Sequence, residues 1–83
     1  MIKFNLKALI SDKEFREGRK INYEEISEYT GISRPTLSKI ATKRGYNITS
    51  DNIEKICNFF GCRFDDFMTI VHEENSTKEK DKL

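Results

Sequence analysis

The chain has 83 residues, 36% of them apolar, with 15 Lys and Arg against 14 Asp and Glu and a formal net charge of +1. A chain of this length forms one domain with a small core, so pairing with a second copy would bury further surface. A net charge near zero gives no argument from overall basicity for nucleic acid. No apolar run approaches the roughly 18 residues of a membrane helix, and the N-terminus lacks the apolar core of a secretion signal, which favours a cytoplasmic protein.

The first predicted helix runs from residue 6 to residue 17, because apolar residues recur at helical spacing at its start. Asn5 is its expected N-cap, and Leu6, Leu9 and Ile10 are expected to face inward. Beyond Ile10 the apolar spacing fades.

A charged stretch, residues 13–20 with the sequence KEFREGRK, leads to the next helix. Gly18 is the expected break, because glycine readily adopts the backbone conformations that end a helix. Phe15 is the one large apolar residue of the stretch, and it is expected to fold back as an anchor.

Residues 22–40, NYEEISEYTGISRPTLSKI, have the pattern of two short helices joined by a tight turn. Gly31 can take the left-handed conformation that ends the first helix and redirects the chain. Four residues earlier, Ser27 is small enough for the two helix axes to approach closely. The expected apolar contacts between the helices are Ile26, Ile32, Leu37 and Ile40. The pattern predicts a helix-turn-helix.

Three helix starts carry capping residues. Asn22 precedes the first helix of this pair, with Glu25 three residues later to complete a capping box, and Ser33 precedes the second. Thr49 is the expected cap of a later helix. A hydrophobic staple accompanies each start: Ile21 with Ile26, Ile32 with Leu37, and Ile48 with Ile53.

After the second helix of the pair, residues 42–47 are expected to form a loop hinged at Gly45. A fourth helix is predicted over residues 50–60 and a short fifth helix over residues 65–68. The fourth helix has one apolar stripe, which consists of Ile53, Ile56, Cys57 and Phe60. The apolar residues near the two ends, Ile2 and Phe4 with Ile70 and Val71, can pair as a short two-stranded ribbon.

The segments MIKFNLKALI, TGISRPTLSKIA and TSDNIEKICNFFGC together resemble the phage-repressor type of helix-turn-helix domain, the XRE or Cro-like family. The resemblance covers residues 1 to about 68 and implies an all-α, compact five-helix bundle like that of lambda repressor. It also implies a DNA-binding transcriptional regulator that acts as a homodimer on double-stranded DNA. We expect a DNA-binding domain over residues 1–72 and a disordered polar tail over residues 73–83, EENSTKEKDKL.

The distribution of charge along the chain supports DNA binding more than the net charge does. Between Ser33 and Ser50 the charged residues are all basic, namely Arg34, Lys39, Lys43 and Arg44, whereas the preceding helix carries Glu24, Glu25 and Glu28. A solvated basic face that complements the negative end of its own helix is the simpler alternative. The expected outward orientation of Arg34, Thr36, Ser38 and Lys39 favours DNA.

The resemblance places base contacts on this helix. Arg34 is the first choice for guanine, and Pro35 can touch a thymine methyl although a polar residue is common there. Ser38 and Lys39 lie one turn further on, and Thr36 is either a base contact or a partner within its own first turn. The expected phosphate contacts are Tyr23, Thr42, Lys43, Arg44, Tyr46 and Asn47. Tyr46 has an equal alternative, packing its ring under the loop.

No enzyme is indicated, and no cofactor, metal or small-molecule substrate. Cys57 and Cys62 are separated by a spacing that fits no usual zinc pattern, so two free thiols are expected. His72 has no recognisable nucleophile beside it, and Asp65 and Asp66 are better explained as the start of a helix.

The favoured interpretation is a repressor that binds a pseudo-palindromic operator as a homodimer through the helix that begins after Ser33. The alternative is an adaptor or antitoxin-like module that uses the same fold to bind a protein. Aromatic residues of the last two helices are expected to pack in the core, or to form a dimer surface where exposed: Phe59, Phe60, Phe64 and Phe67.

Overall fold

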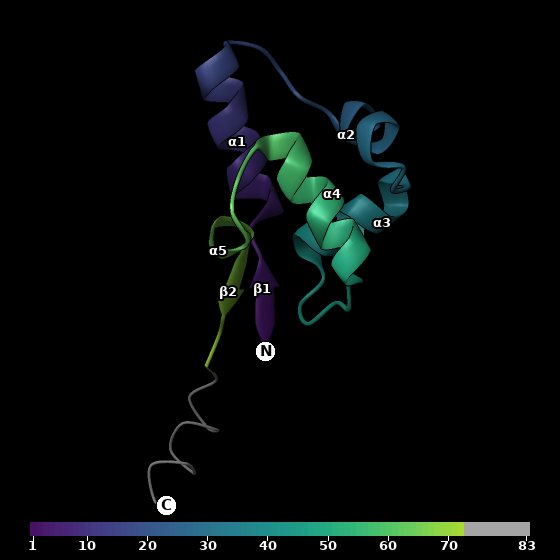
Figure 1. The fold of residues 1–83 in the computed structure, drawn as a ribbon, viewed down its shortest axis with the longest axis vertical. Helices are drawn as coiled ribbons and strands as arrows, with labels where there is room; N and C mark the ends of the chain where they lie inside the picture. The colour runs from purple at the N-terminus through teal and green to yellow at the C-terminus, as the bar shows by residue number, and fades with distance from the viewer. Residues whose placement is uncertain (73–83) are drawn as a thin grey trace, which may run out of the picture.

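The structure, a computed structural model, describes residues 1–72 (Figure 1). The predicted tail, residues 73–83, lies outside the described residues. The elements in chain order are β1 (Ile2–Phe4), α1 (Leu6–Glu17), α2 (Tyr23–Thr30), α3 (Arg34–Thr42), α4 (Ser50–Phe60), α5 (Phe64–Phe67) and β2 (Met68–Ile70). The predicted fold of five helices with a two-stranded ribbon is therefore confirmed.

The core takes one completely buried side chain from each helix. These five side chains have 0% of their surface exposed, and they are Leu6, Ile26, Leu37, Ile56 and Phe67. Each comes from the apolar stripe of an otherwise polar helix, so the stripes meet at one centre and stabilise the bundle by burial. Leu9, Ile10 and Ile53 are partly buried around this centre, as predicted.

The turn between α2 and α3 has the predicted geometry. Gly31 has φ 78° and its N–H donates to the Ser27 carbonyl at 2.8 Å, which ends α2. The buried Thr30 hydroxyl holds Ile32, the residue after Gly31. It donates to the Ile26 carbonyl at 2.8 Å and accepts from the Ile32 N–H at 3.1 Å. This hydroxyl satisfies a backbone donor that the sharp turn would otherwise leave buried and unpaired.

Three of the four predicted N-caps are confirmed. Backbone N–H groups donate to the side-chain oxygens of Asn22 at 2.9 Å, Ser33 at 3.3 Å and Thr49 at 3.2 Å. The prediction for Asn5 is wrong, because its side chain makes no capping bond to α1. Its Nδ2 donates instead to the Asp66 carbonyl and to Thr69 Oγ1. Asn5 therefore joins the start of α1 to α5 and the ribbon.

The stretch between α1 and α2 differs from its prediction. Helix α1 does run to Glu17 and ends at Gly18, with φ 68°, but Phe15 is 88% exposed and does not fold back as an anchor. Residues 13–17 are helical, and a helical residue on the outer side of α1 cannot reach the core. The i,i+4 ion pairs Asp12–Arg16 and Lys13–Glu17 support these last turns.

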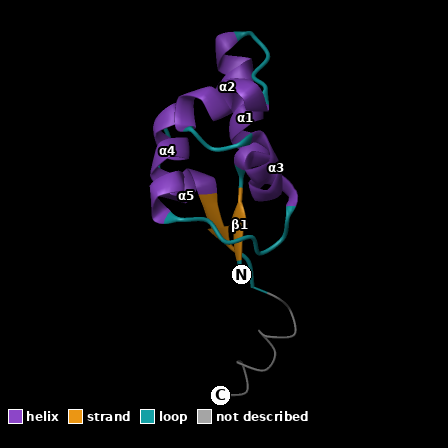
Figure 2. Cartoon of the chain, turned by 90° about the vertical axis from the view of Figure 1, so that its right-hand side faces the viewer, coloured by secondary structure: helices purple, strands orange, loops and turns teal. Residues whose placement is uncertain are grey.

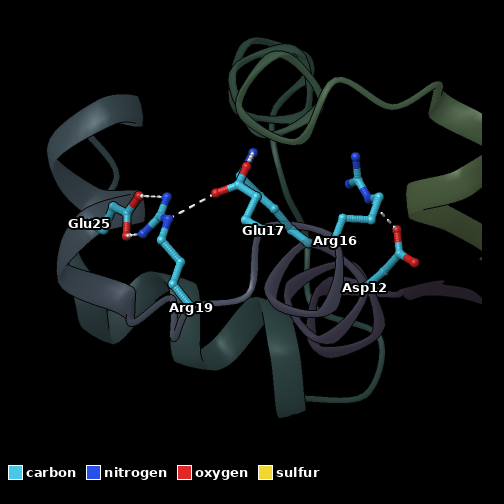
Figure 3. A network of polar contacts seen from close by, with 6 residues as sticks. Asp12, Arg16, Glu17, Arg19 and Glu25 are labelled. Atoms are coloured by element: carbon cyan, nitrogen blue, oxygen red, sulfur yellow. Dashed lines mark hydrogen bonds and ion pairs between the residues drawn. The ribbon is translucent and has the colours of Figure 1, made fainter.

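The capping box at α2 is only half formed. The Glu25 carboxylate binds the Arg19 guanidinium through two contacts, at 2.8 and 2.7 Å, and no bond back to the Asn22 N–H is formed (Figure 3). The bidentate pair with arginine gives the carboxylate two charge-assisted bonds to a cation in place of the single bond from the Asn22 N–H. The connection is also held at Ile21, whose N–H donates to Glu14 Oε2 at 2.8 Å.

The ribbon is antiparallel and pairs Ile2 with Ile70, Lys3 with Thr69 and Phe4 with Met68. It lies below the helices in Figure 2, next to α5. The Phe4 ring packs on Phe67 with centroids 5.3 Å apart, which anchors the ribbon to the core. The fifth helix begins one residue earlier than predicted, at Phe64, because the Arg63 N–H donates to Asp66 Oδ2 and so sets the first turn.

Candidate DNA-binding site

Helix α3 has an apolar inner side and a polar outer side. Leu37 and Ile40 are buried, while four of the five predicted base-contact residues are exposed: Arg34, Pro35, Ser38 and Lys39. Thr36 is only half-buried, and its Oγ1 accepts a hydrogen bond from Ser33 Oγ at 2.9 Å. The structure therefore engages Thr36 in its own first turn, which was the alternative considered for it. None of the base contacts is tested by the structure, and they remain predictions.

Pro35 lies in the first turn of α3, where a residue without an N–H leaves no helix bond unmade. Arg34 and Pro35 line one open depression together with the first residues of α2, Tyr23 and Glu24, and the cap Asn22. The start of α3 thus lies beside the start of α2. This arrangement brings a base-contact candidate, a phosphate-contact candidate and one acidic residue onto one surface.

The predicted phosphate contacts lie at two places. Tyr23 is half-buried at the start of α2, and Thr42, Lys43, Arg44 and Asn47 are exposed at the end of α3 and in the loop after it. The Thr42 hydroxyl donates to the Ser38 carbonyl at 2.7 Å, so its oxygen stays close to the helix. The loop turns at Gly45, with φ 70°, as predicted.

Two roles were predicted for Tyr46, packing under the loop and contact with a phosphate, and the structure bears on the first. Tyr46 is half-buried and packs against the core, as the first role required. The Lys43 ammonium lies 5.8 Å from the centroid of its ring, a favourable arrangement of a cation over an aromatic face. The Tyr46 ring thereby supports Lys43 from below, and its own phosphate contact stays a prediction.

The ion pairs of the molecule divide its cations into two groups. Lys13, Arg16, Arg19, Lys55 and Arg63 each have a carboxylate within 4.0 Å. In the described part of the chain, Arg34, Lys39 and Lys43 have none, and the same holds for Lys3, Lys7 and Lys20 elsewhere on the surface. The outer side of α3 and its end therefore carry positive charge that no carboxylate of residues 1–72 pairs with directly. Such a surface favours a polyanion.

The acidic side chains near α2 are partly neutralised. Arg19 lies between Glu17 and Glu25 (Figure 3). Lys13 Nζ lies 2.8 Å from Glu17 Oε2, the carboxylate oxygen that Arg19 does not contact. The hydrogen bond from Arg19 lowers the pKa of Glu25, and the hydrogen bond from Lys13 lowers the pKa of Glu17. Both carboxylates are held charged within this network, which leaves Glu24 as the acidic residue beside Arg34.

The two cysteines are free thiols, as predicted. Cys57 is buried, and this burial raises its pKa to about 12. Cys62 follows the end of α4 at Gly61, and its N–H donates to the Cys57 carbonyl at 3.0 Å. A thiol with a raised pKa is a poor metal ligand and a poor nucleophile near neutral pH. The cysteines thus serve the packing and the end of α4.

Some residues of this site were not predicted from the sequence. Thr30 is buried and its hydroxyl holds the turn; its place four residues after Ile26 is the signal that could have indicated its burial, although not its hydroxyl contacts. The position of Glu24 beside Arg34 depends on the angle between two helices. Lys3 lines a depression with Lys43 and Arg44, and only the ribbon brings it there.

Two helices joined at a left-handed glycine, with the second presenting an exposed cationic side, define a helix-turn-helix DNA-binding domain. Residues 5–73 match the Cro/C1-type HTH DNA-binding domain, and the chain belongs to this family. The resemblance stated from the sequence is confirmed. A comparison with curated proteins finds no matching relative.

The family is one of DNA-binding domains, so the prediction that the chain is not an enzyme is also confirmed. No helix among the described residues is both long and apolar enough to cross a membrane.

Proposed function

We propose that the protein is a transcriptional repressor that binds a pseudo-palindromic operator as a homodimer, with α3 in the major groove. The observation that carries the proposal is the group of exposed cations on α3 and at its end, Arg34, Lys39 and Lys43, which no carboxylate of the described residues pairs with. A bound promoter would be closed to other proteins, so binding alone is enough for repression. A regulator of this kind works where its DNA is, and we propose the cytoplasm.

The proposed division of labour follows position along α3. Arg34 stands at the start of the helix and offers two donors to one guanine, and Lys39 reaches a base or a phosphate one turn later. Ser38 lies between them on the exposed side. Lys43 and Arg44, where the chain leaves the helix, bind phosphates and fix the register on the duplex.

The homodimer is proposed from the size of the core and from exposed apolar residues. Phe64 is 55% exposed, and the cross-strand partners Ile2 and Ile70 are 45% and 66% exposed. Phe64 lies on α5 and Ile70 on β2, and neither lines a depression with α3 or the loop after it, whereas Ile2 on β1 also lines the depression at the end of α3. A two-fold dimer through this surface would present two α3 helices to successive major grooves about 34 Å apart.

The test is selection of duplexes from a randomised pool by the purified protein at several salt concentrations, followed by sequencing. The expected result is a motif with two-fold symmetry that the Arg34→Ala variant loses at one position in each half. General, salt-sensitive binding without an enriched motif would contradict sequence-specific repression.

A second function is favoured by one observation, the large apolar side chains exposed on α1 and α2. Phe15 is 88% exposed and Tyr29 63% exposed. An adaptor or antitoxin-like module would cover such side chains with a partner protein. Covering of the surface of residues 33–50 by a protein, measured as slowed hydrogen exchange in the complex, would favour this function over the operator.

A further inference from the structure

An open depression lies between β1 and the end of α3, and its walls come from segments far apart in the sequence. Lys3 lines one side, and Thr42, Lys43 and Arg44 line the other. Both views of the molecule place the loop that follows α3 beside β1 (Figures 1 and 2). Three cationic side chains therefore border one open surface, next to the residues proposed to bind phosphates.

The charge of Lys3 is not matched within the described residues. Lys3 is exposed, and like Lys7 and Lys20 it has no carboxylate partner among residues 1–72, in contrast to Lys13 and Lys55; unlike Lys7 and Lys20, it borders this depression. Lys3 and Lys43 both line the depression without a carboxylate partner among residues 1–72, so their charges repel each other unless an anion lies between them. The chemistry that fits this surface is a phosphate of a polyanion.

Strand β1 holds Lys3 in place from two sides. On one side it pairs with β2, and the Asn5 N–H at its end donates to the Phe67 carbonyl at 2.7 Å. On the other side the Met1 sulfur, just before the strand, lies 3.4 Å from the position that a Cβ on Gly45 would occupy, so the Met1 side chain lies against the loop after α3. A side chain on a held strand loses less freedom on binding than one on a free terminus.

We propose that β1 is part of the DNA interface, and that Lys3 binds a backbone phosphate beside those bound by Lys43 and Arg44. The strand precedes residue 5, where the match to the family begins. This inference rests on the proposed function, because it takes α3 to lie in the major groove. The Lys3 contact adds affinity and orientation and reads no base.

The test compares Lys3→Gln with the matched control Lys55→Gln, which removes an exposed lysine of α4 that pairs with Asp51. Affinity is measured by fluorescence anisotropy from 50 to 200 mM salt, for the selected operator and for a duplex of random sequence. Lys3→Gln is expected to weaken binding to both duplexes by the same factor and to lower the salt slope by about 0.9. The loss of affinity should then be about 3-fold larger at 50 mM than at 200 mM salt.

Three further measurements decide the outcome. Lys3→Arg should keep the wild-type slope, since it keeps the charge. Ethylation of single phosphates should identify one phosphate whose modification weakens binding of the wild type but not of Lys3→Gln. A variant that is merely unstable would not lose sensitivity at one phosphate alone. A wild-type slope for Lys3→Gln, together with a lower slope for Lys43→Gln, would overturn the role of β1 and leave the proposed function standing. Unchanged slopes for both variants and for Arg34→Gln would overturn the proposed function itself.

Discussion

At the scale of single residues, the proposed site separates base contacts from phosphate contacts. Arg34 is exposed at the start of α3, and Lys43 is exposed at its end above the Tyr46 ring. We expect Arg34→Ala to weaken operator binding by roughly 1–3 kcal/mol and to relax the preference at one base position. Lys43→Ala should weaken all sequences alike and flatten the salt dependence. Binding curves for the operator, single-base variants of it and a random duplex measure both effects, and equal losses on every sequence for both variants would exclude Arg34 as a reader.

Glu24 is the acidic residue that lines the same depression as Arg34 and Tyr23. Its carboxylate lies near the proposed path of the DNA backbone, so it repels phosphates and lowers affinity. Replacing Glu24 by Gln keeps the size of the side chain and removes this repulsion, and we expect tighter binding by roughly 0.2–1 kcal/mol, an amount typical of an interaction between two exposed charges. Glu28→Gln, on the same helix but outside the depression, is the control. Weaker binding of the Glu24 variant would indicate that the carboxylate accepts a hydrogen bond from a base.

At the scale of elements, the network of Lys13, Glu17, Arg19 and Glu25 joins the end of α1 to the start of α2 (Figure 3). The pKa values of Glu17 and Glu25 are lowered from 4.5 by hydrogen bonds from Lys13 and Arg19. A carboxylate with a lowered pKa in the folded state stabilises the fold above its unfolded pKa, and this stabilisation is lost as the pH falls through the folded value. The protein should therefore lose stability as the pH decreases below 4.5.

The measurement is thermal unfolding between pH 7 and pH 3 at low salt for the wild type and Arg19→Gln. The wild type should be more stable at pH 7, and the two unfolding temperatures should converge as the acids are protonated. Arg16→Gln is the matched control, because Arg16 pairs with Asp12 inside α1 and joins no second element. Since the network is exposed to solvent, added salt should reduce the difference. A constant difference at every pH would mean that Arg19 acts through packing.

The same elements show which features can be predicted from the sequence and which cannot. Caps, glycines and apolar spacing are local signals, and they gave α1, the turn at Gly31 and the buried Leu37 correctly. The errors at Asn5 and Phe15 have different origins: Phe15 lies on the outer side of α1, whereas the role of Asn5 depends on which distant group lies beside it. Asn5 has a better partner in the ribbon than in its own helix, and local pattern cannot show that.

The candidate site divides in the same way. Helical spacing predicts that Arg34, Ser38 and Lys39 share the exposed side of α3, since inward positions are already taken by Leu37 and Ile40. The surroundings of α3 were not predictable, because Glu24 reaches the start of α3 through the angle of α2, and Lys3 reaches its end through the pairing of β1.

At the scale of the whole molecule, a domain of this size leaves apolar residues uncovered, and their position decides how two copies can meet. The proposed dimer surface on α5 and the ribbon contains Phe64 and Ile70, whereas Phe15 lies on α1. Phe64→Glu places a charge where the partner would lie, and a charge left unpaired in an interface is costly. We expect the dimer dissociation constant to rise at least about tenfold, which corresponds to about 1.4 kcal/mol.

Sedimentation equilibrium over a range of concentrations measures this change, with Phe15→Glu as the control that removes an exposed phenylalanine elsewhere. The Phe64→Glu variant should also bind a single half-site as the wild-type subunit does, while its affinity for the full operator falls, because two linked subunits bind cooperatively and separate ones do not. Dissociation caused by Phe15→Glu instead would place the interface on α1. The two α3 helices would then have a different separation, and the spacing between half-sites in the selected motif should report it.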